Sequence, residues 1–296
     1  MNKKTGMIFA MGAAFFYGVS TITGKMAYVG GGNAVTISFY RQLLSIPILF
    51  LILKMAKISL KVTKRELIGL VLLGLLGGFI TGALLYMSYE FISVGLSSCI
   101  HFAYPVILAC IYAFIFKEKF SKTKVLALAL GFGGMWFFLD SNVTINLIGI
   151  LAALMSALTY AFYLIVMDKW GLKSMNGFKL SFYCCIFSGI SLYTFGLFKG
   201  YNFTGVTSSG AWVWILGTSL LISVLGNTMI PVAVNNVGPT VTGIIGILEP
   251  VVSVIMGVLL LGESFGISNI VGAILVLGAG ILLALEKGDI IKKVPV

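Results

Sequence analysis

A carboxylic acid and a proline stand side by side inside an apolar stretch near the C-terminal end of the chain. The stretch opens with GILEPVV at Gly246 and continues to Leu261 without another charged residue. At 1.5 Å of helical rise per residue, Glu249 would lie about 12 Å from the inner end of its helix. An ionisable group at that depth is costly and is a functional candidate by default. Because burial disfavours the charged carboxylate, Glu249 is expected to be neutral at rest and able to carry a proton.

A structural role for Glu249 is the alternative. Pro250 removes one backbone hydrogen bond and loosens the helix at this point. A protonated glutamate could bind the freed backbone groups or a neighbouring helix.

The second candidate is a cation within an apolar stretch. Arg41 follows Ser38, Phe39 and Tyr40 and lies about 10 Å below the outer membrane surface by helical rise. Its guanidinium could bind an anionic group of a substrate, or pair with a carboxylate such as Glu90. Snorkelling of the side chain to the outer interface is an equally good interpretation. Tyr40 is retained as a candidate beside it.

Polar residues on one face of a further apolar stretch extend the set. Ser97, His101 and Tyr104 align at helical spacing. When the two halves of the chain are compared, Thr242 is the counterpart of Ser97 and Glu249 that of Tyr104. The two faces could therefore line one cavity. His101, the only histidine, could carry a proton or be a satisfied core residue.

Two tyrosines and an amide complete the candidates. Tyr17 and Tyr160 occupy matching places 143 residues apart and could offer rings and hydroxyl groups to a substrate, or simply pack. Asn227 is the deepest amide of its apolar stretch. The predicted substrate-binding residues are Tyr17, Tyr40, Arg41, Ser97, His101, Tyr104, Tyr160, Asn227, Thr242 and Glu249, with Glu249 as the proton-coupling candidate. One histidine and four scattered cysteines are poor material for a metal site or catalytic centre, so no metal, cofactor or catalytic residue is predicted.

Membrane-spanning helices must position these residues. The 296 residues are 59% hydrophobic and 10% charged, with a mean hydropathy of +1.08, and a soluble domain needs far more charged surface. At about 20 residues per crossing, ten helices are predicted. They are Gly6–Tyr28, Ala34–Met55, Leu67–Tyr89, Leu96–Phe116, Val125–Leu139, Ile145–Met167, Phe178–Phe198, Ala211–Val234, Val241–Leu261 and Ile267–Leu285.

The distribution of basic residues predicts the orientation of the chain. On the side of the N-terminus lie 17 of the 20 lysines and arginines, namely Lys3, Lys4, Lys54, Lys57, Lys61, Lys64, Arg65, Lys117, Lys119, Lys122, Lys124, Lys169, Lys173, Lys179, Lys287, Lys292 and Lys293. By the positive-inside rule both termini are cytoplasmic, in a multi-pass protein of the cell membrane. The net charge of +11 therefore reflects membrane orientation rather than nucleic-acid binding.

Weak internal similarity predicts two copies of a five-helix unit. The triplet SFY at Ser38 recurs at Ser181, and AYPV at Ala103 is answered by LEPV at Leu248. Because five crossings is an odd number, the second copy must be inverted in the membrane.

The charges of two matching segments agree with this inversion. Segment Lys117–Lys124 is strongly basic, whereas its counterpart Gly262–Asn269 contains no basic residue. Inverted repeats are typical of secondary transporters, whose binding site lies near the midplane. The predicted organisation is a first repeat in residues 1–140, an inverted second repeat in residues 145–288, and a cytoplasmic tail in residues 289–296.

The chain resembles the EamA-type branch of the drug/metabolite transporter superfamily. The resemblance is carried by YPVILACIYAFIFKEKFS from Tyr104 and EPVVSVIMGVLLLGESFG from Glu249, each followed by a helix rich in small residues. The first copy departs from the family pattern at Ala127, where glycine is usual. The resemblance covers nearly the whole chain. It implies an all-α integral membrane protein with ten helices in two inverted five-helix repeats, which moves amino acids, other metabolites or drugs, often outward.

The predicted function is secondary transport by alternating access, with a small amino-acid-like metabolite moved outward. An exporter of multiple drugs or cationic compounds is one alternative, and a membrane sensor that binds a ligand without moving it is another. The connections are too short for a catalytic or nucleotide-binding domain, and no Walker-type motif occurs, so an enzyme or an ATP-driven pump is not expected. The expected partners are a small-molecule substrate, the lipid bilayer and, if Glu249 is coupled, protons; no oligomeric state is predicted.

Overall fold

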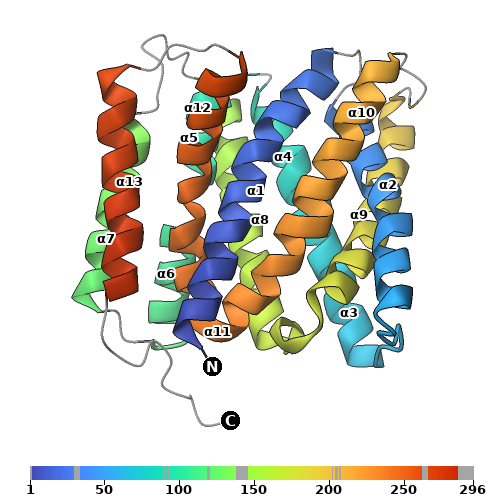
Figure 1. The fold of residues 1–296 in the computed structure, drawn as a ribbon, viewed down its shortest axis with the longest axis horizontal. Coiled ribbons are helices and arrows are strands. Elements are labelled where there is room, and N and C mark those ends of the chain that lie inside the picture. Colours follow the sequence, from blue (N-terminus) through green and yellow to red (C-terminus); the bar gives the residue numbers. More distant parts are fainter. Residues whose placement is uncertain are drawn as a thin grey trace.

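The computed structural model describes residues 2–29, 34–89, 91–92, 94–118, 121–137, 146–201, 203, 206, 208–261 and 266–285. Every regular element within these ranges is helical, and the long helices stand side by side in one bundle (Figure 1). The predicted all-α membrane class is therefore confirmed.

Eight elements come from the first half of the chain. They are α1 (Lys3–Val29), α2 (Ala34–Met55), α3 (Lys64–Leu73), the π-helical segment η1 (Gly74–Ile80), α4 (Thr81–Tyr89), α5 (Val94–His101), α6 (Tyr104–Phe114) and α7 (Lys122–Trp136). Because α3, η1 and α4 follow without interruption, they form one long helix with a π-helical middle.

Eight elements also come from the second half. They are α8 (Leu147–Lys169), the short 3-10 helix η2 (Leu172–Ser174), α9 (Gly177–Lys199), α10 (Ser209–Thr218), the π-helical segment η4 (Ser219–Gly226), α11 (Asn227–Gly246), α12 (Leu248–Leu261) and α13 (Ile267–Leu285).

Capping residues fix several helix ends. Thr63 and Glu66 form a capping box at the start of α3, in which Glu66 Oε2 accepts from Thr63 N at 2.7 Å. Asn146 caps α8 by accepting from Ile148 N at 2.9 Å. α9 ends at Gly200, whose left-handed φ of 71° suits glycine. These caps place the helix ends in the connections, where sequence patterns predicted them.

Seven helical segments within the described residues are long and apolar enough to cross a membrane. They are Lys3–Gly24, Val35–Met55, Lys64–Leu85, Leu96–Phe114, Leu147–Lys169, Gly177–Lys199 and Ser209–Gly246. Leu248–Leu260 and Ile270–Leu283 are shorter apolar helices. The number of ten crossings stays a prediction.

The segment Ser209–Gly246 contains a reversal of the chain at Gly238. Gly238 has φ 82° and ψ 162°, a conformation that glycine alone adopts readily. The arm before Gly238 runs antiparallel to α1. Gly6, near the start of α1, lies against the end of that arm, where an added Cβ atom would lie 2.7 Å from Asn236 Cβ. Tyr17, farther along α1, donates a hydrogen bond to Asn227, which lies earlier in the arm. The arm after Gly238 leads into α12, which also packs on α1. The reversal thus separates the predicted eighth and ninth spans.

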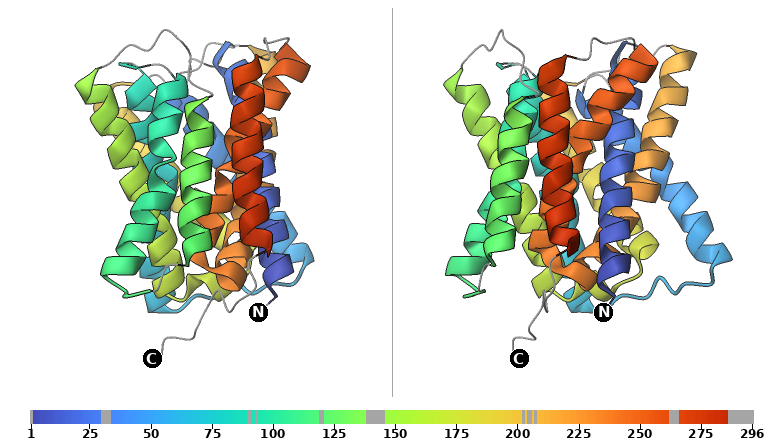
Figure 2. Two further views of the ribbon diagram at one scale, coloured as in Figure 1. Left: turned by 90° about the vertical axis from the view of Figure 1, so that its left-hand side faces the viewer. Right: turned by 60° about the vertical axis from the view of Figure 1, so that its left-hand side comes forward.

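α1 begins and α13 ends at the same end of the bundle (Figures 1 and 2). The α2–α3 and α8–α9 connections lie there too, and they contact each other: Lys179 Nζ donates to Lys61 O at 2.5 Å and Trp170 Nε1 donates to Arg65 O at 3.1 Å. We name this the basic end. The start of α1 and the end of α13 at this end agree with the prediction that both termini lie on one side of the membrane. That this side is the cytoplasm stays a prediction. Glu90, the connection 262–265 and the tail 289–296 lie outside the described residues.

The main apolar core lies between α1, α6, α8 and α11. Leu108 and Leu164 are among its fully buried side chains. Large apolar side chains on the outside, such as Phe114 and Phe198, are exposed, as expected of surfaces that contact lipid. The core adjoins the cavity described below, because Leu73, Tyr104 and Leu164 belong to both.

Candidate functional site

Two apolar helices are interrupted just before a proline that follows a candidate residue directly. Ile247 separates α11 from α12 and donates to Ile244 O at 3.2 Å, so Glu249 lies in the first turn of α12. The expectation that Glu249 sits inside one continuous helix from Val241 is wrong. The physical reason is that Pro250 has no N–H to continue the hydrogen-bond ladder.

The equivalent break lies 145 residues earlier. Phe102 and Ala103 separate α5 from α6, which begins at Tyr104 and Pro105. Tyr104 and Glu249 thus occupy matching positions at the start of two broken helices. Discontinuous helices of this kind commonly expose backbone groups at transport sites.

Two π-helical segments also match each other in sequence. η1 begins at Gly74 and η4 begins at Ser219, again 145 residues apart. Gly77 and Gly78 of η1 and Ile222 of η4 line a cavity inside the bundle. π-helical turns are rare and are frequent at functional sites.

The cavity has a volume of about 220 Å³ and receives side chains from both halves of the chain. Eight of the ten predicted substrate-binding residues line it. They are Tyr17, Arg41, His101, Tyr104, Tyr160, Asn227, Thr242 and Glu249. The lining therefore combines one cation and one carboxyl group with aromatic rings and neutral polar groups.

An aromatic cluster of His101, Tyr104, Tyr160 and Tyr163 forms one wall. The Tyr104 and Tyr160 rings meet edge to face at 4.6 Å, and Tyr160 stacks on Tyr163 at 5.4 Å. His101 lies 5.6 Å from the Tyr160 ring. Tyr104 Oη donates to Gly243 O at 3.2 Å, which ties this wall to α11. The ring faces and the remaining hydroxyl lone pairs make the wall suited to a positively charged group.

His101 also has a structural partner. Its Nδ1 lies 2.6 Å from Ser156 Oγ on α8. The two interpretations from the sequence therefore combine in one residue, since His101 is hydrogen-bonded and also lines the cavity.

Arg41 lies on another part of the lining, on α2. Among the described residues its guanidinium has no hydrogen-bond or ion-pair partner, while its carbonyl oxygen accepts from Ser45 Oγ and Ser219 Oγ. Gln42 and Ser188 line the cavity near it. As far as the described part of the chain shows, the cavity thus offers a ligand a guanidinium group without a hydrogen-bond or ion-pair partner.

Tyr40 and Ser97 do not line the cavity. Tyr40 donates to Phe203 O at 2.9 Å and packs edge to face on Trp212 at 4.6 Å. One position along a helix turns the side chain by about 100°, so Arg41 and Tyr40 face different neighbours. Ser97 is buried, and its Oγ has no hydrogen-bond partner among the described residues.

Sequence reasoning missed several polar residues of the lining, namely Ser20, Gln42, Thr81, Tyr163 and Ser188. Tyr163 follows Tyr160 by three residues, and this helical spacing could have predicted it. Gln42 is a neutral amide in the middle of an apolar stretch, a position where polar groups are rare.

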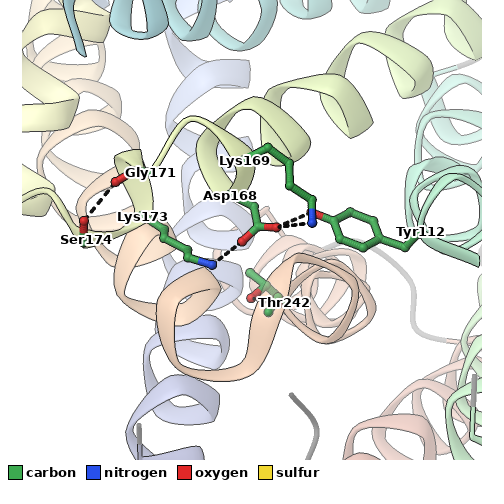
Figure 3. A network of polar contacts seen from close by, with 8 residues as sticks. Tyr112, Asp168, Lys169, Gly171, Lys173, Ser174 and Thr242 are labelled. Carbon is green, nitrogen blue, oxygen red and sulfur yellow. Dashed lines mark hydrogen bonds and ion pairs between the residues drawn. The ribbon is translucent and has the colours of Figure 1, made fainter. Parts of the chain in front are cut away.

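A polar network lies beside the cavity wall toward the basic end (Figure 3). Tyr112 Oη donates to Asp168 Oδ2 at 2.6 Å, Lys173 pairs with Asp168 Oδ1, and Lys169 Nζ lies 3.5 Å from Oδ2. Thr242, which lines the cavity, stands next to these side chains. The network joins α6, the end of α8 and η2 below the cavity.

Comparisons with known proteins agree with this architecture. The model of the EamA-like transporter family matches residues 4–139 and again residues 147–285. A protein of Archaeoglobus fulgidus described as an uncharacterized transporter is 22% identical over 220 residues, which cover 74% of this chain and 76% of that protein. A crystal structure of a protein that is 12% identical superimposes with a TM-score of 0.77, covering 96% of this chain and 98% of that chain. At 12% identity, the likeness to this crystal structure concerns the fold alone.

Proposed function

Because this chain belongs to the EamA-like transporter family, we propose that it is a secondary transporter that carries a small amino-acid-like metabolite outward across the cell membrane. The observation that carries the proposal is that one cavity is lined both by the Arg41 guanidinium, which has no hydrogen-bond or ion-pair partner among the described residues, and by Glu249. A zwitterionic substrate could bind Arg41 through its carboxylate and Glu249 through its ammonium group. The outward direction follows from the family resemblance.

Two inverted five-helix repeats, in residues 1–140 and 145–288, are part of the proposal. The family model matches the chain twice, and the π-helical segments and helix breaks recur at a constant offset of 145 residues. Rocking of one repeat against the other would expose the cavity to each side in turn.

The network around Asp168 would close the basic end of the cavity in this cycle. It joins Tyr112 of the first proposed repeat to Asp168 and Lys173 of the second. These contacts must break when the repeats separate at that end.

Glu249 is the proposed coupling group. A carboxyl group in the cavity could bind a proton from one side and release it to the other, since its charge state changes its affinity for a cationic group. Transport driven by the substrate gradient alone is the simpler variant of the same cycle.

Export of cationic compounds is a second candidate, favoured by the aromatic cluster. Four rings line the same cavity as Glu249, and rings beside a carboxyl group suit organic cations. In that case Arg41 would have no role in binding.

Transport by the purified protein in sealed vesicles separates these candidates. We expect efflux of labelled leucine to fall about ten-fold in Arg41→Lys, because lysine keeps the charge but loses the planar fork that matches a carboxylate. Efflux of 3-methylbutylamine, which is leucine without its carboxylate, should be unchanged by Arg41→Lys. Arg65→Lys is the matched control, as the same substitution at the only other arginine, which is exposed at the basic end.

Each contrary result identifies another function. Efflux of the amine that exceeds that of leucine, with no effect of Arg41→Lys on either, favours export of cations. Saturable leucine binding in detergent without movement across the vesicle membrane favours a sensor.

A further inference from the structure

A buried amide beside Arg41 lacks a hydrogen-bond donor. Gln42 on α2 is 2% exposed and lines the cavity, and its Oε1 atom has no hydrogen-bond partner among the residues that the structure describes. Three other buried side-chain oxygens in the described part of the chain also lack partners, those of Ser97, Ser223 and Thr240. None of these three residues lines the cavity, so Gln42 is the one whose missing donor a ligand could supply.

Two hydroxyl groups of the cavity lining direct their protons to backbone carbonyl groups and not to Gln42. Ser188 Oγ donates to Gly74 O at 2.8 Å, and Thr81 Oγ1 donates to Leu76 O at 2.6 Å. Each hydroxyl has a single proton. The acceptor therefore remains unsatisfied among the described residues, and an unpaired buried acceptor destabilises the empty cavity.

Gln42 lies against two glycines on neighbouring helices. A Cβ atom on Gly78 of η1 would lie 3.4 Å from Gln42 Nε2, and one on Gly189 of α9 would lie 3.7 Å from Gln42 Cβ. The side chain is therefore almost fully buried between α2, η1 and α9.

Arg41 and Gln42 are consecutive, and both side chains reach the cavity. The guanidinium donates and carries positive charge, whereas the amide oxygen only accepts. A ligand that satisfies both must present a carboxylate and, close to it, an N–H or O–H group. A carboxylic acid with an amino or hydroxyl group on carbon 2 has this arrangement.

We propose that Gln42 determines specificity by accepting a hydrogen bond from the 2-amino or 2-hydroxyl group of a carboxylate substrate bound by Arg41. The inference rests on the proposed function, because it assumes that Arg41 binds a carboxylate. An acid without a donor on carbon 2 leaves Gln42 Oε1 unpaired in the complex. Sites built to bind a polar group reject analogues that lack it.

Three acids of equal carbon skeleton test the proposal without a mutation. The purified wild-type protein is titrated with leucine, 2-hydroxy-4-methylpentanoate and 4-methylpentanoate, and the dissociation constants are measured by calorimetry. The first two acids should bind on the order of ten-fold or more tighter than the third, as expected for one hydrogen bond to a buried acceptor. Gln42→Met keeps the length of the side chain and removes the acceptor. It should bind 2-hydroxy-4-methylpentanoate and 4-methylpentanoate within about two-fold of each other, since neither then meets an unpaired oxygen, whereas leucine keeps any contribution of its ammonium group at Glu249.

Thr240→Val is the matched control, because it removes another buried oxygen without a partner and lies outside the cavity lining. It should keep the wild-type preference. Gln42→Leu replaces Gln42→Met if the methionine variant does not fold, as judged by its melting transition.

The outcomes separate this inference from the proposed function. Equal binding of all three acids by the wild type, or an unchanged preference in the Gln42 variant, overturns the role of Gln42 and leaves the carboxylate substrate in place. Binding of none of the acids by the wild type overturns the carboxylate substrate and this inference with it.

Discussion

The hydroxyl group of Tyr112 on α6 donates a 2.6 Å hydrogen bond to Oδ2 of Asp168 at the end of α8. The side chain of Asp168 is 9% exposed, and its other oxygen pairs with Lys173 of η2. Thr242 of the cavity wall stands beside this contact (Figure 3). Toward the basic end, polar contacts between three elements therefore lie next to the cavity wall.

Asp168→Asn should weaken this closure. The amide keeps the shape of the side chain but removes the charge that holds Lys173 and Lys169. Because hydrogen bonds to charged groups are stronger than neutral ones and both lysines are partly exposed, we expect a loss of about 1–2 kcal/mol in the free energy of unfolding. The melting temperature should fall, and a cysteine placed at Thr242 should react faster with a reagent applied from the basic end.

Glu66→Gln is the control for Asp168→Asn. Glu66 is partly exposed at the same end, and glutamine can keep its capping box. It should change neither the melting temperature nor the labelling. The same melting temperature and labelling rate in Asp168→Asn would show that Asp168 does not close this end.

Polarity inside apolar spans was enough to find the two residues with charged side chains in the cavity lining. Glu249 and Arg41 stood out because charged groups are costly in a bilayer, and both line the cavity. Helical spacing correctly grouped His101 with Tyr104. The same argument failed for Ser97, which is buried outside the cavity lining. Tyr40 was retained as the neighbour of Arg41, but one step along a helix points a side chain to a different neighbour. Whether these residues bind a substrate stays a prediction.

The interruptions of the helices could be predicted only in part. Pro250 signalled a weak point, and the reversal at Gly238 falls between the predicted eighth and ninth spans, but the break at Ile247 was not predicted. The π-helical segment η1 has no sequence pattern of its own. It forms where Gly77 packs on the ring of Tyr163, whose atoms would lie 2.6 Å from an added Cβ. Such tertiary contacts lie outside what local spacing can predict.

Accessible cysteines should identify the side on which the basic end lies. Ser59, between α2 and α3, and Ser208, before α10, are exposed at opposite ends of the bundle (Figure 1). On a background without the four native cysteines, a membrane-impermeant reagent outside intact cells should label Ser208→Cys and spare Ser59→Cys. Both variants should react once the membrane is opened. Labelling of Ser59→Cys alone in intact cells would reverse the predicted orientation.

Close packing of α1 on α12 should depend on Gly18. A Cβ atom there would lie 2.6 Å from Val252 Cβ and 2.7 Å from the carbonyl oxygen of Glu249. Since the backbone of α12 cannot turn away, Gly18→Ala should cost about 1–3 kcal/mol and displace Glu249. Both the melting temperature and transport should fall.

Gly24→Ala on the same helix is the matched control for Gly18→Ala. No described atom lies within 4 Å of a Cβ there, and alanine favours a helix by up to about 1 kcal/mol over glycine. Its melting temperature should stay equal or rise. Equal stability of Gly18→Ala and Gly24→Ala would contradict a close contact between α1 and α12 at Gly18.

Glu249→Gln should separate substrate binding from proton coupling. The amide can hydrogen-bond like a protonated carboxylic acid, but it cannot take up or release a proton. If Glu249 carries protons, exchange of labelled for unlabelled substrate between the two sides of a vesicle should survive, because exchange need not release the proton. Accumulation driven by an imposed pH gradient should be lost, whereas Glu66→Gln, the same change at a partly exposed acid, should behave as wild type. Accumulation by Glu249→Gln equal to that of the wild type, at equal protein level, would assign Glu249 to the alternative role, an acid that stabilises the backbone where α12 begins before Pro250.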